Sequence, residues 1–159
     1  MKLRCFALCA ALGLPLVFPI GLSAQNVIGT MDVTPAKTPH LSGNILGFSM
    51  SASTPINMAT GTASGKRQHN PISITRAADA NTASFVTMAS TNETIKKLSI
   101  KIGQLTYTMT NAVVVNQAIV AGTFDPASGG AAIEELQFTY QKLEIDYVGK
   151  AVATDDWNL

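Results

Sequence analysis

The amino-acid sequence predicts a mainly β domain with one short helix, and three observations support this class. The chain has 159 residues, which is enough for one hydrophobic core but too few for two comfortable ones. Hydrophobic residues make up 47% of the chain, and this content argues against disorder. Beyond residue 25, apolar and polar residues alternate with a period of two, which is typical of half-buried strands.

The first 24 residues have the order of a secretory signal peptide. Lys2 and Arg4 form a positive head, residues 5–22 form an apolar run, and Ser23 and Ala24 are the small residues before the expected cleavage site. An uncleaved anchor helix is the alternative, but two prolines interrupt a run that barely reaches the roughly 20 residues needed to span a bilayer. We therefore expect a secreted or periplasmic protein that uses a Sec-type export route and has no membrane span after cleavage.

Cleavage changes the chemistry that the chain carries. Cys5 and Cys9 leave with the leader, so the mature protein is expected to have neither a disulfide nor a cysteine-ligated metal. The net charge of the whole chain is only +1, which gives no support to nucleic-acid binding. We expect one domain over residues 25–150 and a loose C-terminal tail over residues 151–159.

Alternating runs along the mature chain predict strands. Ile72 and Ile74 alternate with polar residues, as do the apolar residues of 98–102 and of 105–109. Gly103-Gln104 lies between the last two runs, where a tight hairpin connection is needed. We expect strands at these three places, with the last two joined as a hairpin.

The C-terminal run contains a change of phase. Leu136, Phe138 and Tyr140 share one face of an extended strand, whereas Leu143 and Ile145 follow one residue out of phase. Either a β-bulge lies near residues 141–142, or the strand crosses there from one sheet to another. Both devices curl a sheet into a barrel.

Two segments break the alternation. Between Asn81 and Thr91, apolar residues at positions 85, 88 and 89 predict a short amphipathic helix capped by Asp79 or Asn81. The stretch 53–65 has no sustained alternation and predicts a long exposed loop or an extended hairpin. A connection of that length in a compact domain usually has a function.

The sequence contains no recognisable catalytic or metal-ligating motif. His40 is expected as a solvated loop residue, and His69 as a structural hydrogen-bonding residue at the start of a strand. The acidic pairs at 134–135 and 155–156 are adjacent, so in strands their side chains point to opposite faces, and solvated charge or an intersubunit salt bridge is the expected role. We expect no catalytic residue, no metal and no cofactor. A deep pocket where acidic groups and an imidazole converge would contradict this expectation.

Three stretches, in their order and spacing, carry a resemblance to a known family. The first is GKRQHNPISITR at 65–76, followed by Asp79 and the short helix; the second is EELQFTYQKLEI at 134–145; the third is TDDW at 154–157. Together they resemble the Hcp family, the hemolysin-coregulated proteins that form the inner tube of type VI secretion systems. The first stretch is similar to the family's central signature, the second to its last long strand and the third to the tails of some members.

The resemblance implies a small closed β-barrel of two curved antiparallel sheets with one short helix, assembled as a homohexameric ring. Rings of this family stack into a tube whose lumen carries secreted effector proteins, and the subunits have no enzymatic activity. By position, the 53–65 region would be the protruding loop that contacts a neighbouring ring or subunit. The contact residues expected in this loop or directly after it are Asn57, Met58, Thr60, Thr62, Lys66 and Arg67. The residues expected to serve the fold are His69, Pro71, Ile74, Asp79, Glu135, Phe138 and Tyr140.

Two other classes of function stay open. Members of the family normally have no signal peptide, so residues 1–24 indicate an exported relative, which could be adapted to another binding role. The alternative is an extracellular β-barrel binding module that presents the 53–65 loop to a carbohydrate or a protein partner. An exported hydrolase is the third interpretation, and the scarcity of histidine and of catalytic motifs makes it the least supported.

Overall fold

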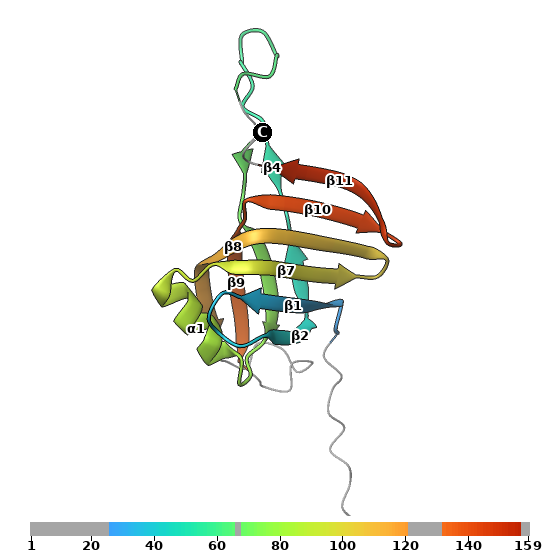
Figure 1. Cartoon of the computed structure of the whole chain (residues 1–159). Helices are drawn as coiled ribbons and strands as arrows, with labels where there is room; N and C mark the ends of the chain where they lie inside the picture. Colours follow the sequence, from blue (N-terminus) through green and yellow to red (C-terminus); the bar gives the residue numbers. More distant parts are fainter. Residues whose placement is uncertain (1–25, 66–67, 121–131, 157–159) are drawn as a thin grey trace, which may run out of the picture.

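The computed structural model describes residues 26–65, 68–120 and 132–156, which form a mainly β fold with one helix (Figure 1). The predicted fold class is confirmed at this level. The predicted signal peptide lies outside the described residues. In chain order, the elements are β1 (Gly29–Pro35), β2 (Leu41–Ile45), β3 (Gly47–Ser49), β4 (Ala52–Ser53), β5 (Gln68–His69), β6 (Ile72–Ala77), α1 (Thr82–Thr91), β7 (Ile95–Ile102), β8 (Leu105–Val120), β9 (Ile133–Thr139), β10 (Lys142–Tyr147) and β11 (Lys150–Asp156).

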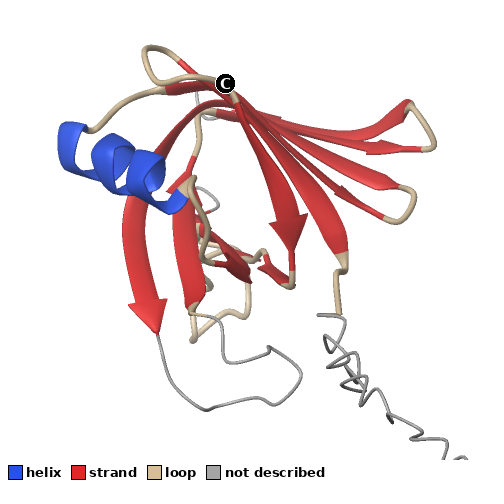
Figure 2. Cartoon of the chain, turned by 90° about the horizontal axis from the view of Figure 1, so that it is seen from below, coloured by secondary structure: helices blue, strands red, loops and turns tan. Residues whose placement is uncertain are grey.

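Two curved layers of antiparallel strands face each other across the core (Figures 1 and 2). The pairing follows the order β2-β1-β7-β8-β9-β6-β3, with β10 paired to β8 and β11 paired to β10. The long strand β8 belongs to both layers, because its first half pairs with β7 and β10 and its second half pairs with β9. Its backbone is irregular at Asn111, where φ is 51°, between the two halves.

The predicted closure into a barrel is not confirmed by hydrogen bonding. The pairing path is open, with β2 at one end and β3 at the other. These two end strands are consecutive in the chain and are separated only by Leu46, whose N–H donates a hydrogen bond to the Thr75 carbonyl (2.7 Å). At this side the two layers are therefore joined by a bend of the chain, because the segment that leaves one layer pairs at once with β6 in the other.

The change of phase near residue 141 is a crossing between the two layers. β9 ends at Thr139 and pairs with β6 and with the second half of β8. β10 begins at Lys142 and pairs with the first half of β8 and with β11. Of the two predicted devices, the crossing is the one that the structure contains.

The apolar faces of the two layers meet in a single core. The first layer contributes Met31, Val33, Leu98, Ile100 and Met109, and the second contributes Ile72, Ile74, Leu136 and Phe138, all of them buried. Each set follows the alternation seen in the sequence, because successive side chains of a strand point to opposite faces. The predicted hairpin at Gly103-Gln104 joins β7 to β8, and Gly103 adopts a φ of 57° that glycine tolerates without strain.

The predicted helix is confirmed as α1, which covers one side of the core (Figure 2). Phe85 and Met88 are its buried residues, and the Phe85 ring meets the Phe138 ring edge to face at 6.5 Å. The predicted side-chain cap is wrong. Asn81 stands at the N-cap, but its Nδ2 donates to the carbonyl of Ser42 (3.2 Å), and Asp79 Oδ1 accepts from the N–H of Asn81 (2.7 Å). Both polar side chains are thus engaged outside the helix.

The prediction of a loose tail from residue 151 is wrong for the part that the structure describes. Residues 150–156 form β11, which pairs with β10, with Asp155 opposite Leu143 and Ala153 opposite Ile145. The segment has no alternation of apolar and polar residues, so its sequence gave no strand signal. It is ordered by the edge of β10, whose backbone donors and acceptors need partners.

Candidate functional site

The 53–65 region is part of an extended hairpin that projects from one end of the molecule (Figure 1). We call residues 52–65 and 68–69 the projecting hairpin. β4 pairs with β5 at its base, and Ile56 pairs with Ala63 farther out. Near the tip, the N–H of Gly61 donates to the carbonyl of Asn57, and the N–H of Asn57 donates to the carbonyl of Thr62, both at 2.8 Å. Of the two forms predicted for this region, the structure contains the extended hairpin.

The tip of the projecting hairpin presents apolar side chains to solvent. Met58 is 88% exposed and Ile56 is 58% exposed. Their own subunit leaves most of the surface of these two side chains uncovered. Another molecule could therefore pack against them. The predicted contact residues Asn57, Met58, Thr60 and Thr62 all lie in this exposed tip, whereas Lys66 and Arg67 lie outside the described residues.

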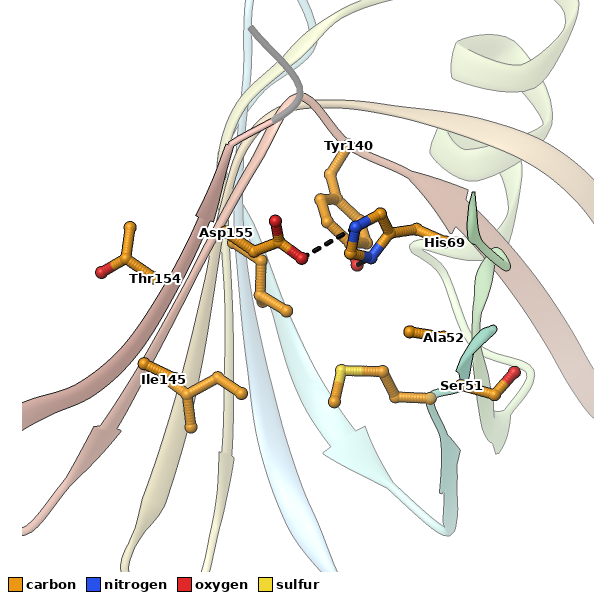
Figure 3. Close-up of a pocket in the computed structure, with 10 residues that line it drawn as sticks. Ser51, Ala52, His69, Tyr140, Ile145, Thr154 and Asp155 are labelled. Atoms are coloured by element: carbon orange, nitrogen blue, oxygen red, sulfur yellow. Dashed lines mark hydrogen bonds and ion pairs between the residues drawn. The ribbon is translucent and has the colours of Figure 1, made fainter. Parts of the chain in front are cut away.

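His69 joins the base of the projecting hairpin to the C-terminal strand (Figure 3). Its Nε2 lies 2.8 Å from Oδ2 of Asp155 on β11, and its Nδ1 lies 3.3 Å from the hydroxyl of Tyr140 at the β9–β10 crossing. The His69 and Tyr140 rings also meet edge to face, with centroids 6.0 Å apart. Only 10% of the His69 side chain is exposed, so water competes little for these contacts. His69 is the last residue of β5 and not the first residue of a strand, and both of its ring nitrogens have polar partners there.

A small hollow lies beside this contact. Met50, Leu143 and Ile145 are among its apolar walls, and His69 and Asp155 line one end (Figure 3). The hollow has a volume of about 160 Å³, whereas pockets that bind small molecules occupy roughly 300–1,000 Å³. An imidazole and a carboxylate do converge here, so the position of any nucleophile decides whether the site resembles that of a hydrolase.

The arrangement around His69 does not have the order of a hydrolase site. A catalytic histidine directs one ring nitrogen to a carboxylate and the other to a nucleophile. Here Asp155 lies at Nε2, and the buried phenol of Tyr140 lies at Nδ1. The nearby Ser51 accepts a hydrogen bond from Asn70 Nδ2 (2.9 Å), and its Oγ points away from His69 (Figure 3). Within the described residues, the geometry joins structural elements and does not present a serine to the imidazole.

Other residues of the expected signature lie in or next to the ladder between β6 and β9. Ile74 pairs with Leu136 in this ladder, and Phe138 pairs with the first residue of β6. Pro71, which has no N–H to donate, stands immediately before β6 and thus outside the ladder. Glu135 is exposed on the outer face of β9. These positions form part of the body from which the projecting hairpin extends.

A buried ionic cluster, which sequence reasoning missed, joins β6, β8, β9 and α1. Arg76 is 1% exposed, and its Nη1 lies 2.8 Å from Oε2 of Glu134, which is fully buried. Nη2 of the same guanidinium pairs with Asp79. At the start of α1, Thr82 Oγ1 donates to Glu134 Oε2 (3.2 Å), and Gln117 Nε2 of β8 donates to Oε1. A buried carboxylate requires such a set of donors, because an uncompensated charge in the core is costly.

The cluster corrects the expectation that Glu134 is a solvated charge. The prediction that adjacent acids point to opposite faces holds, since Glu134 is buried and Glu135 is exposed. A signal was present in the sequence, because Glu134 is in phase with the buried residues Leu136 and Phe138. That phase places its carboxylate in the core, where only a buried cation can accompany it.

A second carboxylate, that of Glu93, holds the connection between β1 and β2. It accepts hydrogen bonds from the N–H of Lys37 (2.5 Å), from the N–H of Thr38 (2.7 Å) and from Thr38 Oγ1 (2.6 Å). These hydrogen bonds, above all the one from the Thr38 side chain, lower the pKa of Glu93 against the opposing effect of burial. Glu93 therefore serves the fold, as an ionised acceptor.

Within residues 26–65, 68–120 and 132–156, no group of three or more histidine, cysteine or acidic side chains is placed to hold a metal ion. In the same ranges, no helix has the length and apolar character needed to cross a bilayer.

The fold and the site define a class: a structural β protein with a two-layer body, a projecting hairpin and an anchored hairpin base. Comparison with known proteins agrees with this class. The model of the family described as "Type VI secretion system effector, Hcp" matches residues 40–147. Among curated protein sequences, no relative matches the chain.

Solved structures share this fold at low sequence identity. A crystal structure of an Hcp protein has a TM-score of 0.73 and 12% identity, covering 81% of this chain and 98% of that one. A mutant of Hcp1 from the E. coli EAEC 042 pathovar has a TM-score of 0.71 and 16% identity, covering 82% and 99%. A chain of the 6-fold symmetrised baseplate of the anti-feeding prophage has a TM-score of 0.51 and 17% identity, covering 76% and 93%.

Because the family model spans more than half of the sequence, the chain belongs to the Hcp family. It is a structural subunit of the type VI secretion tube class, and the function that the family implies is self-assembly.

Proposed function

We propose that this protein forms homohexameric rings that stack into a tube, and that the projecting hairpin contacts a neighbouring ring or subunit. The observation that carries the proposal is the position of the hairpin, whose tip lies beyond the two-layer body (Figure 1). Tip side chains can therefore reach another subunit without any change in the core. Family membership and the 6-fold symmetry named for the baseplate neighbour support the ring.

The exposed apolar residues at the tip supply a physical reason for such a contact. Met58 is 88% exposed in the isolated subunit. Burying a side chain of this size fully contributes roughly 1.5–3 kcal/mol, and a ring of identical subunits repeats that gain at every position. A closed ring also limits growth to stacking, because each heterologous contact within the ring is satisfied by the next copy.

The proposal extends to the route and the cargo. Residues 1–24 would direct the chain through a Sec-type export route, and the mature protein would begin near Gln25 and assemble outside the inner membrane. The tube lumen would carry secreted effector proteins, as the family implies. Intact-mass measurement of protein recovered from the periplasm and the medium tests the first point, because an uncleaved chain there would contradict it.

The experiment that tests assembly combines light scattering with negative-stain imaging of the purified protein. Six-subunit rings and stacks are expected for the wild type. Deletion of residues 57–63 is expected to leave the strands folded and to abolish stacking, and Met58→Ser is expected to weaken it. The matched control is Val86→Ser, which changes an exposed apolar residue of α1 instead of the hairpin.

The outcomes separate the two classes of function. A monodisperse monomer at high protein concentration would overturn the ring proposal and favour a binding module that presents the hairpin to another partner. Stacks that form equally well after the deletion would show that the hairpin is not the contact element. Unfolding of the deletion variant alone would show that the hairpin belongs to the core.

A further inference from the structure

We propose that the contact among His69, Tyr140 and Asp155 is a clasp that sets the direction in which the projecting hairpin leaves the body. The need for such a contact begins with the backbone. β4 and β5 form a separate two-stranded sheet, outside the hydrogen-bonded path that contains the other strands. A two-stranded ribbon of this kind is marginal in water by itself.

The joint between the ribbon and the body is irregular. The ladder of β3 and β6 ends with Ser49 opposite Ser73, and the ladder of β4 and β5 begins with Ala52 opposite His69. Residues 50–51 on one strand therefore oppose residues 70–72 on the other, which is one residue too many for a regular ladder. Such a bulge bends a strand and increases its twist. Across the joint, the N–H of Asn70 donates to the carbonyl of Ser51 (3.2 Å), and Asn70 Nδ2 donates to Ser51 Oγ (2.9 Å). These bonds hold the two strands together within the ribbon but do not reach β10 or β11, so they fix the hairpin's direction relative to the body only weakly.

The clasp lies directly beside this joint. His69 is the last residue of β5, and it is held at 2.8 Å by Asp155 from β11 and at 3.3 Å by Tyr140 from the β9–β10 crossing. Both partners belong to the body, and the ring contact with Tyr140 adds a second point of fixation. The His69 side chain is only 10% exposed, and its contacts with Asp155 and Tyr140 point in different directions. Together they restrict both the tilt and the rotation of the hairpin base.

A small rotation at the base of the projecting hairpin produces a large displacement of its tip. Six residues at about 3.3 Å each place Met58 roughly 20 Å from the start of β4. A rotation of about 10° at the joint would then move the tip by roughly 3 Å, which is more than a hydrogen bond tolerates. This step rests on the proposed function: if the tip contacts another subunit, the clasp determines whether the tip arrives in register.

The chain offers a matched control for the test. His40 Nε2 lies 2.9 Å from Asp32 Oδ2, so the pair has the same chemistry and nearly the same distance as the clasp. In the control pair, the His40 side chain is 55% exposed and the Asp32 side chain is 54% exposed. The pair joins the residue before β2 to β1, away from the projecting hairpin. Substitutions in the two pairs therefore differ in location and burial, and not in residue type.

The experiment is millisecond hydrogen exchange followed by mass spectrometry, at a protein concentration below assembly. The variants are Asp155→Asn and His69→Gln, with Asp32→Asn and His40→Gln as controls and Tyr140→Phe as the mildest change. In the clasp variants, the amide of Asn57 in the projecting hairpin and that of Asn70 at the joint, both hydrogen-bonded in the structure, are expected to exchange at least 10-fold faster, while those of β7 and β8 are unchanged. The control variants are expected to match the wild type.

Hairpin exchange within 2-fold of the wild type in both clasp variants would overturn the proposal. Equal acceleration in β7 and β8 would overturn it too, since the pair would then stabilise the whole fold. If either full substitution fails to fold, Tyr140→Phe decides by the same criterion. Assembly is measured separately. A wild type that forms no rings refutes the proposed function but leaves the exchange result valid. Stacking of Asp155→Asn that equals the wild type refutes the role of the clasp in placing the tip against the next subunit.

Discussion

Replacing Glu134 by glutamine should destabilise the fold severely, although the side chain hardly changes in size. The carboxylate is fully buried and accepts from Arg76 Nη1 (2.8 Å), Thr82 Oγ1 (3.2 Å) and Gln117 Nε2. In the Glu134→Gln variant, the amide would turn an N–H toward one of these donors, and the guanidinium would lose a buried counter-charge. Removing one partner of a buried ion pair costs about 3–5 kcal/mol.

The assay is urea unfolding followed by circular dichroism at one fixed protein concentration, because assembly makes apparent stability depend on concentration. Glu135→Gln is the control: it makes the same chemical change at the neighbouring exposed residue, where an effect within about 0.5 kcal/mol is expected. The thermal midpoint of Glu134→Gln should fall by roughly 10–20 °C. A loss below about 1 kcal/mol, or one equal to that of the control, would refute the assignment of Glu134 to the buried cluster.

Two further predictions follow from the turn and strand contacts. The lowered pKa of Glu93 means that its ionised form is favoured by folding, so its contribution is present above the ordinary value of 4.5 and is lost as pH falls through the lower folded pKa. Glu93→Gln should thus lower the free energy of unfolding by about 1–2 kcal/mol at pH 7, through the loss of charged hydrogen bonds to Thr38. The difference in stability from the wild type should shrink in unfolding curves measured in acid. A difference that does not depend on pH would contradict this. Gly29→Ala should destabilise by about 1–3 kcal/mol, because the added Cβ would meet the backbone oxygen of Lys101 at 2.2 Å. Gly43→Ala, whose Cβ would have its nearest neighbour at 3.7 Å, should be tolerated in the same thermal melts, and equal effects of the two would disprove the steric argument.

The outcome of the sequence predictions depended on the range of the interactions involved. The helix at 82–91 and the turn at 103–104 were predicted correctly, because period and turn chemistry act between close neighbours in the chain. The position of the crossing at 140–141 was also predicted, but not which of two devices it is. The loose tail was a wrong prediction, since the order of β11 comes from the edge of β10 and not from its own composition.

The sequence by itself determined which face of each strand is apolar, where the chain turns and which segment projects from the body. These properties follow from residues that are close to one another in the chain. The phase of β9 indicates that Glu134 faces the core, but only the tertiary structure decided which cation accompanies it and what holds the base of the projecting hairpin. Arg76 and Glu134 are 58 positions apart in the sequence, and His69 and Asp155 are also far apart in it. The physical reason is that the environment of a charged group is set by whatever the fold packs around it, and no local pattern encodes that neighbour.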